Sequence, residues 1–360
     1  MISHKIFKLR KPLFFDGDSL ITANDYKVFT MDLSFNEKLL FKFRVGFISK
    51  VLNKFSLLYR LRRAGVGAAI QHRANYFLTF DRKLFRYNPK VGLNVEHEFI
   101  NGRGPLQYCN ADGIEGFDDT VYFGEYFGNH ARNSVDIYKR LTSGEWSVVF
   151  TFPKGVINHI HALVPDSYRN CIWILAGDFE HSASIWIASN DFKEVEPVVN
   201  GEQVYRACVA FPVEDGLVYA TDTQLAQNSI QKMTMVDGVW KSKTIFEING
   251  SCIYGCEIKD YFVFSSSTEP APNPKSFLKG LLDNKPAPVI KKNQSDVILC
   301  SKRDFSCSVL RTSQKDRYPY RLFQFGTIMF PAGKNNSNLL FTYNIGSVKN
   351  DLSTELIELD

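Results

Sequence analysis

The chain is patterned as short apolar runs separated by Gly, Asp and Asn residues. One clear stretch contains three such runs, at 157–162, 172–178 and 184–191. Short runs rich in β-branched and aromatic residues and bounded by turn residues are typical of β-strands. The stretch therefore predicts three consecutive strands.

The same succession of strands recurs before and after this stretch, with a weak period of roughly 40 to 55 residues. An acidic residue stands at or near the end of the second strand in most of the repeats: Asp25, Asp81, Glu125, Asp178 and Asp222. Extending the register to both ends gives seven units, near 13–44, 65–101, 105–152, 154–199, 203–248, 251–313 and 318–360. Four-stranded units of this length, repeated radially, describe a β-propeller. We predict an all-β fold, a single β-propeller domain over 1–360 with seven four-stranded blades, six being the alternative.

Two hairpin turns resemble the Asp-box, Ser-x-Asp-x-Gly-x-x-Trp, of sialidase-like BNR-repeat propellers in eroded form. The first, at 138–146, keeps Gly144 and Trp146, and the second, at 187–193, keeps Ser189 and Asp191. In that family these turns are structural and lie away from the active centre, so the resemblance implies a fold and no chemistry. The Arg triad and Tyr/Glu pair of sialidases have no residue-by-residue match here.

Two basic insertions interrupt the repeat, at 46–64 and 270–294. The first has helical spacing of apolar residues, and no acid occurs from Lys38 through Phe80. Such a segment is either a solvated helix or lid, or a helix that binds an anionic membrane surface. Propeller topology places both insertions over one face. The membrane hypothesis assigns binding to Phe47, Lys50, Lys54, Phe55, Arg60, Arg62 and Arg63.

Composition narrows the class of protein. With 44% hydrophobic and 22% charged residues the chain is an ordinary globular protein, and a net charge of +5 is too small to imply nucleic acid. The seven cysteines form no CxxC pair, which indicates reduced thiols. Without a secretory signal or an apolar run long enough to span a membrane, we expect a cytoplasmic protein, peripheral on the inner membrane face.

Residues that occur in only one blade are the best functional candidates, because the fold does not require them. His159 and His161 lie two apart on a strand and share one face, so His161 could act as a general base, with His130 in a nearby loop. The alternative is two histidines bonded to backbone carbonyls. We assign no metal and no other cofactor, because no third ligand has a characteristic spacing, although a divalent ion stays possible.

Arg206 interrupts an apolar strand, so its guanidinium must pair either with Asp178 or Asp222 or with an anionic ligand. The repeated acids themselves are explained by turns in which a carboxylate accepts backbone N–H groups. The candidate catalytic residues are His161, His130 and Glu125. The candidate substrate-binding residues are Arg206, Arg132, Arg73, His159, Asp178, Asp222 and Tyr254.

Three functions fit these observations. The first is a glycosyltransferase-like enzyme of surface polysaccharide biosynthesis, acting on a lipid-linked saccharide or sugar nucleotide at the membrane, with His161 or His130 as base. The second is a lyase or hydrolase of an acidic glycan, in which Tyr254 or Tyr205 is the acid of a lyase, or Glu115 and Glu125 are the carboxylates of a hydrolase. The third is a noncatalytic propeller scaffold.

Overall fold

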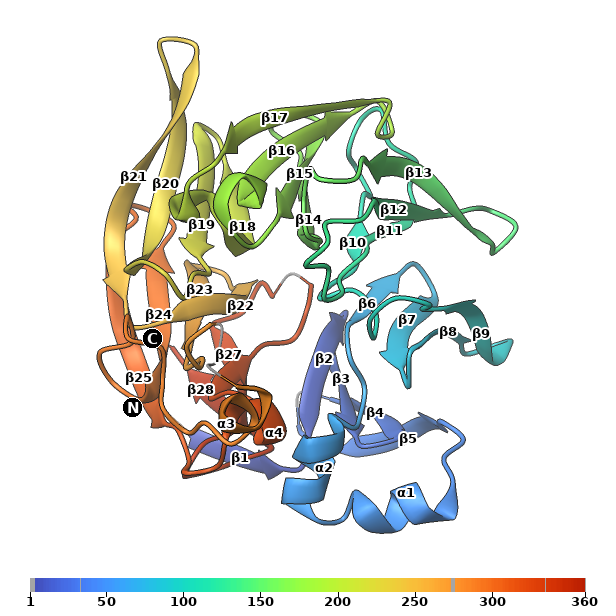
Figure 1. The fold of residues 1–360 in the computed structure, drawn as a ribbon. Coiled ribbons are helices and arrows are strands. Elements are labelled where there is room, and N and C mark those ends of the chain that lie inside the picture. Colours follow the sequence, from blue (N-terminus) through green and yellow to red (C-terminus); the bar gives the residue numbers. More distant parts are fainter. Residues whose placement is uncertain (1–3, 33, 273–275, 334, 360) are drawn as a thin grey trace. The chain divides into compact units, whose positions relative to one another are not determined.

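The computed structural model describes residues 4–32, 34–272, 276–333 and 335–359 (Figure 1). Its contacts divide the chain into two compact units. The first comprises Met1–Val66, Gln224–Gln227 and Ile248–Asp360, and the second comprises Gly67–Thr223 and Asn228–Glu247. The strands form seven four-stranded antiparallel sheets, which confirms the predicted all-β fold and the count of seven blades.

The second unit contains four sheets, each an antiparallel meander whose strands are neighbours in chain order. Their strands are β6 (Ala69–His72), β7 (Asn75–Phe80), β8 (Lys83–Asn88) and β9 (Gly92–Glu98); β10 (Cys109–Asn110), β11 (Val121–Gly124), β12 (Val135–Arg140) and β13 (Trp146–Phe152); β14 (Ile160–Asp166), β15 (Cys171–Ala176), β16 (Ser184–Ser189) and β17 (Glu194–Asn200); β18 (Ala207–Val213), β19 (Gly216–Thr221), β20 (Asn228–Val236) and β21 (Val239–Ile248). Two short 3-10 helices, Glu180–Ser182 and Gln203–Tyr205, precede β16 and β18.

Neighbouring sheets of this unit pack face to face through apolar side chains. The second strand of each sheet is the most deeply buried: every residue of β15 and β19 is buried, whereas β17 and β21 are largely exposed. Trp173 on β15 is fully buried, packs against Trp240 and donates its indole N–H to Asp166 at 2.8 Å. Continuous apolar runs therefore mark strands that are covered on both faces, as expected of inner strands.

The first unit contains three sheets. Their strands are β2 (Lys11–Asp16), β3 (Ser19–Asn24), β4 (Lys27–Met31) and β5 (Glu37–Lys42); β22 (Ser251–Glu257), β23 (Tyr261–Ser267), β24 (Gln294–Ser301) and β25 (Cys307–Gln314); and β26 (Thr327–Met329), β27 (Leu339–Ile345), β28 (Ser353–Glu358) and β1 (His4–Lys8).

The last of these sheets differs from the sequence prediction. The unit predicted at 318–360 supplies only three strands, and β1 pairs with β28 to complete the sheet, with His4 opposite Ile357. The repeat could not reveal this pairing, because β1 is separated from its partner by almost the whole chain. The N-terminal strand thus belongs to the seventh blade and not to the first.

The insertion predicted as one amphipathic helix over 46–64 forms two short helices, α1 (Phe47–Leu52) and α2 (Ser56–Arg62). The 270–294 insertion contains α3 (Phe277–Leu281), and α4 (Tyr320–Phe323) precedes β26. Positions 273–275 of the second insertion lie outside the described residues. Among the residues that the structure describes, no helix is long and apolar enough to cross a membrane.

The two helices of the first insertion use their cations differently. Arg60 is only 1% exposed, and its guanidinium pairs with Asp316 at 2.5 Å and Asp351 at 3.1 Å and donates to the Phe323 carbonyl. Arg62 bonds Asn53 and Ser49 of the α1 segment. The membrane-binding role predicted for Arg60 does not fit this position, because its charge is already neutralised in the protein interior.

Lys11, at the start of β2, gives a pH dependence that can be measured. Its Nζ donates to the Val66 carbonyl at 2.7 Å, and burial lowers the pKa of Lys11 from 10.5 to about 8. Between these two pH values the unfolded chain binds more protons than the folded chain, so folding stability increases as the pH rises.

We expect the free energy of unfolding of the wild type, relative to that of a Lys11→Met variant, to increase from pH 8 towards pH 10. Urea denaturation of both proteins across this range measures the difference. Two pH curves that run parallel would show that Lys11 titrates normally in the folded protein.

Candidate functional site

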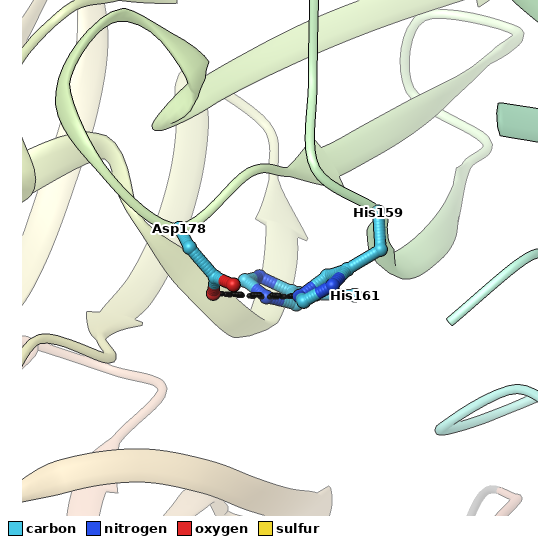
Figure 2. Close-up of side chains that lie close together, drawn as sticks. All are labelled: His159, His161 and Asp178. Carbon is cyan, nitrogen blue, oxygen red and sulfur yellow. Dashed lines mark hydrogen bonds and ion pairs between the residues drawn. The ribbon is translucent and has the colours of Figure 1, made fainter. Parts of the chain in front are cut away.

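His159 and His161 meet at the start of β14. His161 is the extra residue of a β-bulge, because Ile160 pairs with Ala176 while Ala162 pairs with Leu175. Bulges redirect side chains and are frequent next to active sites. The two rings lie with their Nε2 atoms 2.9 Å apart (Figure 2), and the residues are 6% and 2% exposed.

The backbone fixes the tautomer of both rings. His159 Nδ1 lies 2.9 Å from the Phe127 carbonyl oxygen, and His161 Nδ1 lies 2.9 Å from the Ala207 carbonyl oxygen. A carbonyl oxygen can only accept a hydrogen bond, so both Nδ1 atoms must carry the hydrogen. In neutral rings both Nε2 atoms then present lone pairs, which point towards each other at a distance suited to a shared proton or a shared cation.

Asp178 completes this arrangement from the loop after β15. Its Oδ1 lies 3.4 Å from His159 Nε2 and 3.5 Å from His161 Nε2 (Figure 2). The carboxylate is held in place by its turn: Gly177 has φ +80°, and a Cβ there would lie 1.5 Å from the Ser182 carbonyl oxygen. Burial alone would raise the pKa of Asp178, but the contacts with both imidazoles, whose Nε2 atoms donate only when the rings carry a second proton, and the charge of Arg206 outweigh it and lower the pKa.

Arg206, Asp222 and Cys208 surround the histidine–carboxylate group. Arg206 Nη2 lies 3.1 Å from Asp178 Oδ1 and 3.5 Å from Asp222 Oδ2, which confirms the pairing with these two acids that the sequence offered as one alternative. The Cys208 thiol donates to Asp222 Oδ2 at 3.2 Å. Burial and the neighbouring Asp222 raise the pKa of Cys208, so this cysteine is a protonated thiol.

Cys208 occupies the same position in β18 that His161 occupies in β14. It is the extra residue of an equivalent bulge, in which Ala207 pairs with Thr221 and Val209 with Ala220. The repeat therefore places the side chains of these two residues next to each other, and a comparison of the two strands in sequence register could have identified Cys208 as part of the cluster.

Tyr126 and the backbone of its loop also belong to the site, and the sequence did not single them out. The Tyr126 ring packs against His159 with ring centroids 4.4 Å apart. Tyr126 also lines a cavity of about 190 Å³ together with Glu125, Phe99 and Tyr138. A ligand in this cavity would lie beside the ring that covers His159.

Two other candidates of this unit, Glu125 and His130, belong to loop structure. Glu125 accepts the Asp136 N–H at 3.0 Å and a bond from Asn101, and burial raises the pKa of Glu125. His130 is exposed in the loop that Asn129 ties to the Asn158 carbonyl. These contacts place Glu125 and His130 in loop structure outside the histidine–carboxylate group.

The two remaining candidate arginines of this unit also lie outside the group, and the candidate tyrosine belongs to the other unit. Arg132 has φ +47° in a turn, and Arg73 pairs with Asp119, which also bonds His72. Tyr254 lies on β22 in the first unit, where its carbonyl accepts the Ser265 hydroxyl at 3.2 Å. Of the predicted substrate-binding residues in the second unit, those that lie together are His159, Asp178, Arg206 and Asp222.

Comparison with known proteins shows the fold. No family model matches the sequence, and a search of curated proteins finds no relative. Virginiamycin B lyase from Staphylococcus aureus matches over 100% of both chains with a TM-score of 0.61 and 8% identity. A chain of the mitotic checkpoint complex matches with a TM-score of 0.51 and 8% identity, over 99% of this chain and 91% of that chain. At these identities the likeness concerns architecture alone, and the chain has the β-propeller fold.

Proposed function

We propose that this protein is a metal-dependent enzyme, with a divalent ion bound by His159 Nε2, His161 Nε2 and Asp178 Oδ1. The observation that carries the proposal is the convergence of two imidazole lone pairs and a carboxylate oxygen, with both Nδ1 atoms bonded to backbone carbonyls. Metal-ligating histidines commonly donate their second ring N–H to a carbonyl, which fixes the ring for coordination.

The distances between the three atoms suit a first-row metal ion. Separations of 2.9, 3.4 and 3.5 Å place the atoms on a circle of radius about 1.9 Å, slightly below the metal–ligand distance of about 2.0–2.1 Å. The three atoms could therefore hold one divalent ion together. Three protein ligands leave a coordination position for water or substrate, as in catalytic zinc sites.

A second group of residues is also close enough to hold an ion, namely His161, Cys208 and Asp222. This group is the weaker candidate, because the Cys208 thiol already donates its hydrogen to Asp222 Oδ2, a contact that an ion would have to replace. His161 could serve only one of the two groups at a time, since its Nδ1 donates to Ala207 and Nε2 is the one ring nitrogen left for an ion. The set that contains Asp178 is therefore the one we propose.

Two imidazoles and one carboxylate favour zinc or another borderline divalent ion over magnesium or calcium. Such an ion supplies a bound water of lowered pKa and polarises a carbonyl or phosphoryl oxygen. Arg206 pairs with Asp178 and so holds the carboxylate in place, and the Tyr126 ring packs against His159 and orients the imidazole. The residues of this chain thus supply ligands, their orientation and a partly desolvated setting.

We propose an acidic glycan or a sugar nucleotide as the substrate, because its carboxylate or phosphate would complete the coordination of the ion. An activated water would be the nucleophile of a hydrolase or, as hydroxide, the base of a lyase, so the hydrolase or lyase hypothesis takes precedence over glycosyl transfer here. A sialidase-like ancestry, suggested by the eroded Asp-box turns around Gly144 and Asp191, is part of this proposal. The catalytic residues of sialidases are not part of it.

Metal binding by the purified protein tests the proposal. After chelation and buffer exchange, titration calorimetry with Zn²⁺ should show one site per chain, and Asp178→Asn should weaken binding by about tenfold to a hundredfold. Asp222→Asn is the matched control and should bind as the wild type does. Equal binding by the wild type and Asp178→Asn, or binding lost in Asp222→Asn alone, would contradict the assignment.

The same preparations test for turnover. The metal-loaded and the chelated wild type are incubated with acidic polysaccharides and with sugar nucleotides, and new reducing ends, unsaturated products and free nucleotide are measured. Cleavage that depends on the ion supports the proposal. An ion that binds without any turnover across these substrates would instead support the scaffold hypothesis.

A further inference from the structure

The first unit exposes large apolar side chains on two short helices. Six of them are more than half exposed, three on α1 and the residues after it and three on α3 and the residue after it. They are Phe47 (80%), Ile48 (73%), Phe55 (60%), Phe277 (80%), Leu278 (68%) and Leu282 (62%). Single exposed apolar residues are normal, but adjacent ones on the same short elements indicate a binding surface.

The two helices belong to one connected set of elements. Arg62 of α2 bonds Asn53 and Ser49 of the α1 segment, and α2 contacts α4, which in turn contacts α3. The Tyr320 N–H at the start of α4 donates to the Asp283 carbonyl, just after α3. Figure 1 shows α2, α4 and α3 lying together, with α1 continuing from α2.

This set is fixed to the protein interior. Arg60 of α2 is buried between Asp316 and Asp351, and Gln324 donates back to the Arg60 carbonyl at 2.9 Å. The apolar side chains of α1 and α3 are therefore presented by an anchored support. These side chains are exposed to solvent, but the backbone that carries them is already fixed. The entropy cost of ordering this segment on binding is therefore small.

The charges beside these apolar residues are positive. Lys50, Lys54 and Lys279 are exposed on the same elements, and the sequence from Lys38 through Phe80 contains no acid. Two acids lie close by: Asp25 accepts a hydrogen bond from Asn53, and Asp283 accepts the Lys285 N–H. The surface thus combines apolar tips with cations, which complements an anionic and apolar partner.

We propose that α1 and α3 dock this protein onto the surface of a lipid bilayer that contains anionic lipids. Phe47, Ile48, Phe277 and Leu278 enter the boundary between headgroups and acyl chains, and Lys50, Lys54 and Lys279 contact the anionic headgroups. Each cation near such a surface contributes about 1 kcal/mol, and the apolar side chains contribute by burial. The elements are too short to span the bilayer, so binding is peripheral.

Vesicle sedimentation tests this surface independently of the metal site. The wild type should sediment with vesicles of phosphatidylcholine and phosphatidylserine, and much less with phosphatidylcholine alone. Lys50→Ala combined with Lys54→Ala should lower the partition coefficient by about tenfold or more, and Phe47→Ser combined with Phe277→Ser by at least as much. Raised salt should weaken the binding.

The matched control is Ile100→Ser, because Ile100 is 88% exposed in the other unit and has no place in the proposed surface. It should leave vesicle binding unchanged. Circular dichroism of each variant verifies folding. Absence of binding by the wild type, equal binding to neutral and anionic vesicles, or an equal loss in Ile100→Ser would each overturn the proposal. The proposal would also be overturned if the wild type did not bind vesicles but formed a dimer, and Phe47→Ser dissociated that dimer. The surface would then bind a second copy of the chain.

Discussion

Replacement of His161 by alanine should weaken the affinity for a divalent metal ion by at least about a hundredfold. The remaining pair, His159 and Asp178, is too small a ligand set for tight binding. A wild type saturated with Zn²⁺ at a hundred times its dissociation constant should gain about 2.7 kcal/mol of stability, and His161→Ala should gain almost none. Thermal denaturation with and without the ion, together with calorimetry, measures both effects.

His130→Ala is the control for this substitution, because His130 is an exposed histidine of the same unit in a loop outside the metal-ligand set. It should keep the affinity and the metal-dependent stabilisation of the wild type. If His130→Ala lost the ion and His161→Ala kept it, His161 would not be a ligand, and the proposed metal site around Asp178 would be wrong.

Replacement of Arg60 by methionine should be the most destabilising single change outside the core strands. Methionine has a similar length, but it leaves the partly buried Asp351 and the Phe323 carbonyl without their guanidinium partner. Removing one partner of a buried ion pair costs about 3–5 kcal/mol. Asp316 keeps a second cation, Lys315, so the lower end of that range, about 3 kcal/mol, is expected.

Urea denaturation of the purified variant measures this loss. Arg62→Met is the control, since Arg62 is a neighbouring, partly exposed arginine that bonds Asn53 and Ser49 of the α1 segment. Its effect should be below about 1 kcal/mol. Similar effects of the two substitutions would mean that the burial of Arg60 does not decide its contribution.

The sequence predicts the fold of this protein well because the repeat is encoded locally. The buried second strands, such as the one at 172–176, are continuous apolar runs, and the turn residues between strands recur in register. The pairing of β1 with β28 has no local signal, and neither does the interruption of the 46–64 insertion at Asn53. Both depend on tertiary contacts, which cannot be predicted from the period of the sequence repeat.

The candidate site was predicted in part. The candidates predicted from the sequence include His159, His161, Asp178 and Arg206, and the structure does place them together. The third proposed ligand, an oxygen, was not identified because Asp178 was interpreted as one of the repeated acids that accept backbone N–H groups. Glu125 behaves in that way towards Asp136, whereas Asp178 lies against the histidines and Arg206.

Asp178 and Glu125 therefore show that equal positions in a repeat need not have equal roles. The difference depends on the neighbours: a bulge aims His161 at Asp178, and the following blade supplies Arg206. Side-chain direction at a bulge cannot be read from strand spacing, because one extra residue reverses the alternation of faces. This is the physical reason that a correct fold prediction left the ligand set incomplete.

The pairing of β1 with β28 also has a consequence for the order in which the protein folds. During synthesis β1 leaves the ribosome long before its partner strand β28, because the other blades lie between them in the sequence. The edge of β1 must therefore stay unpaired while the other blades form, and such an edge can pair with another chain. A pairing between strands so far apart in the sequence also adds contacts of large sequence separation, which slow folding. Closure of this blade is thus expected to be the late, concentration-sensitive step of refolding.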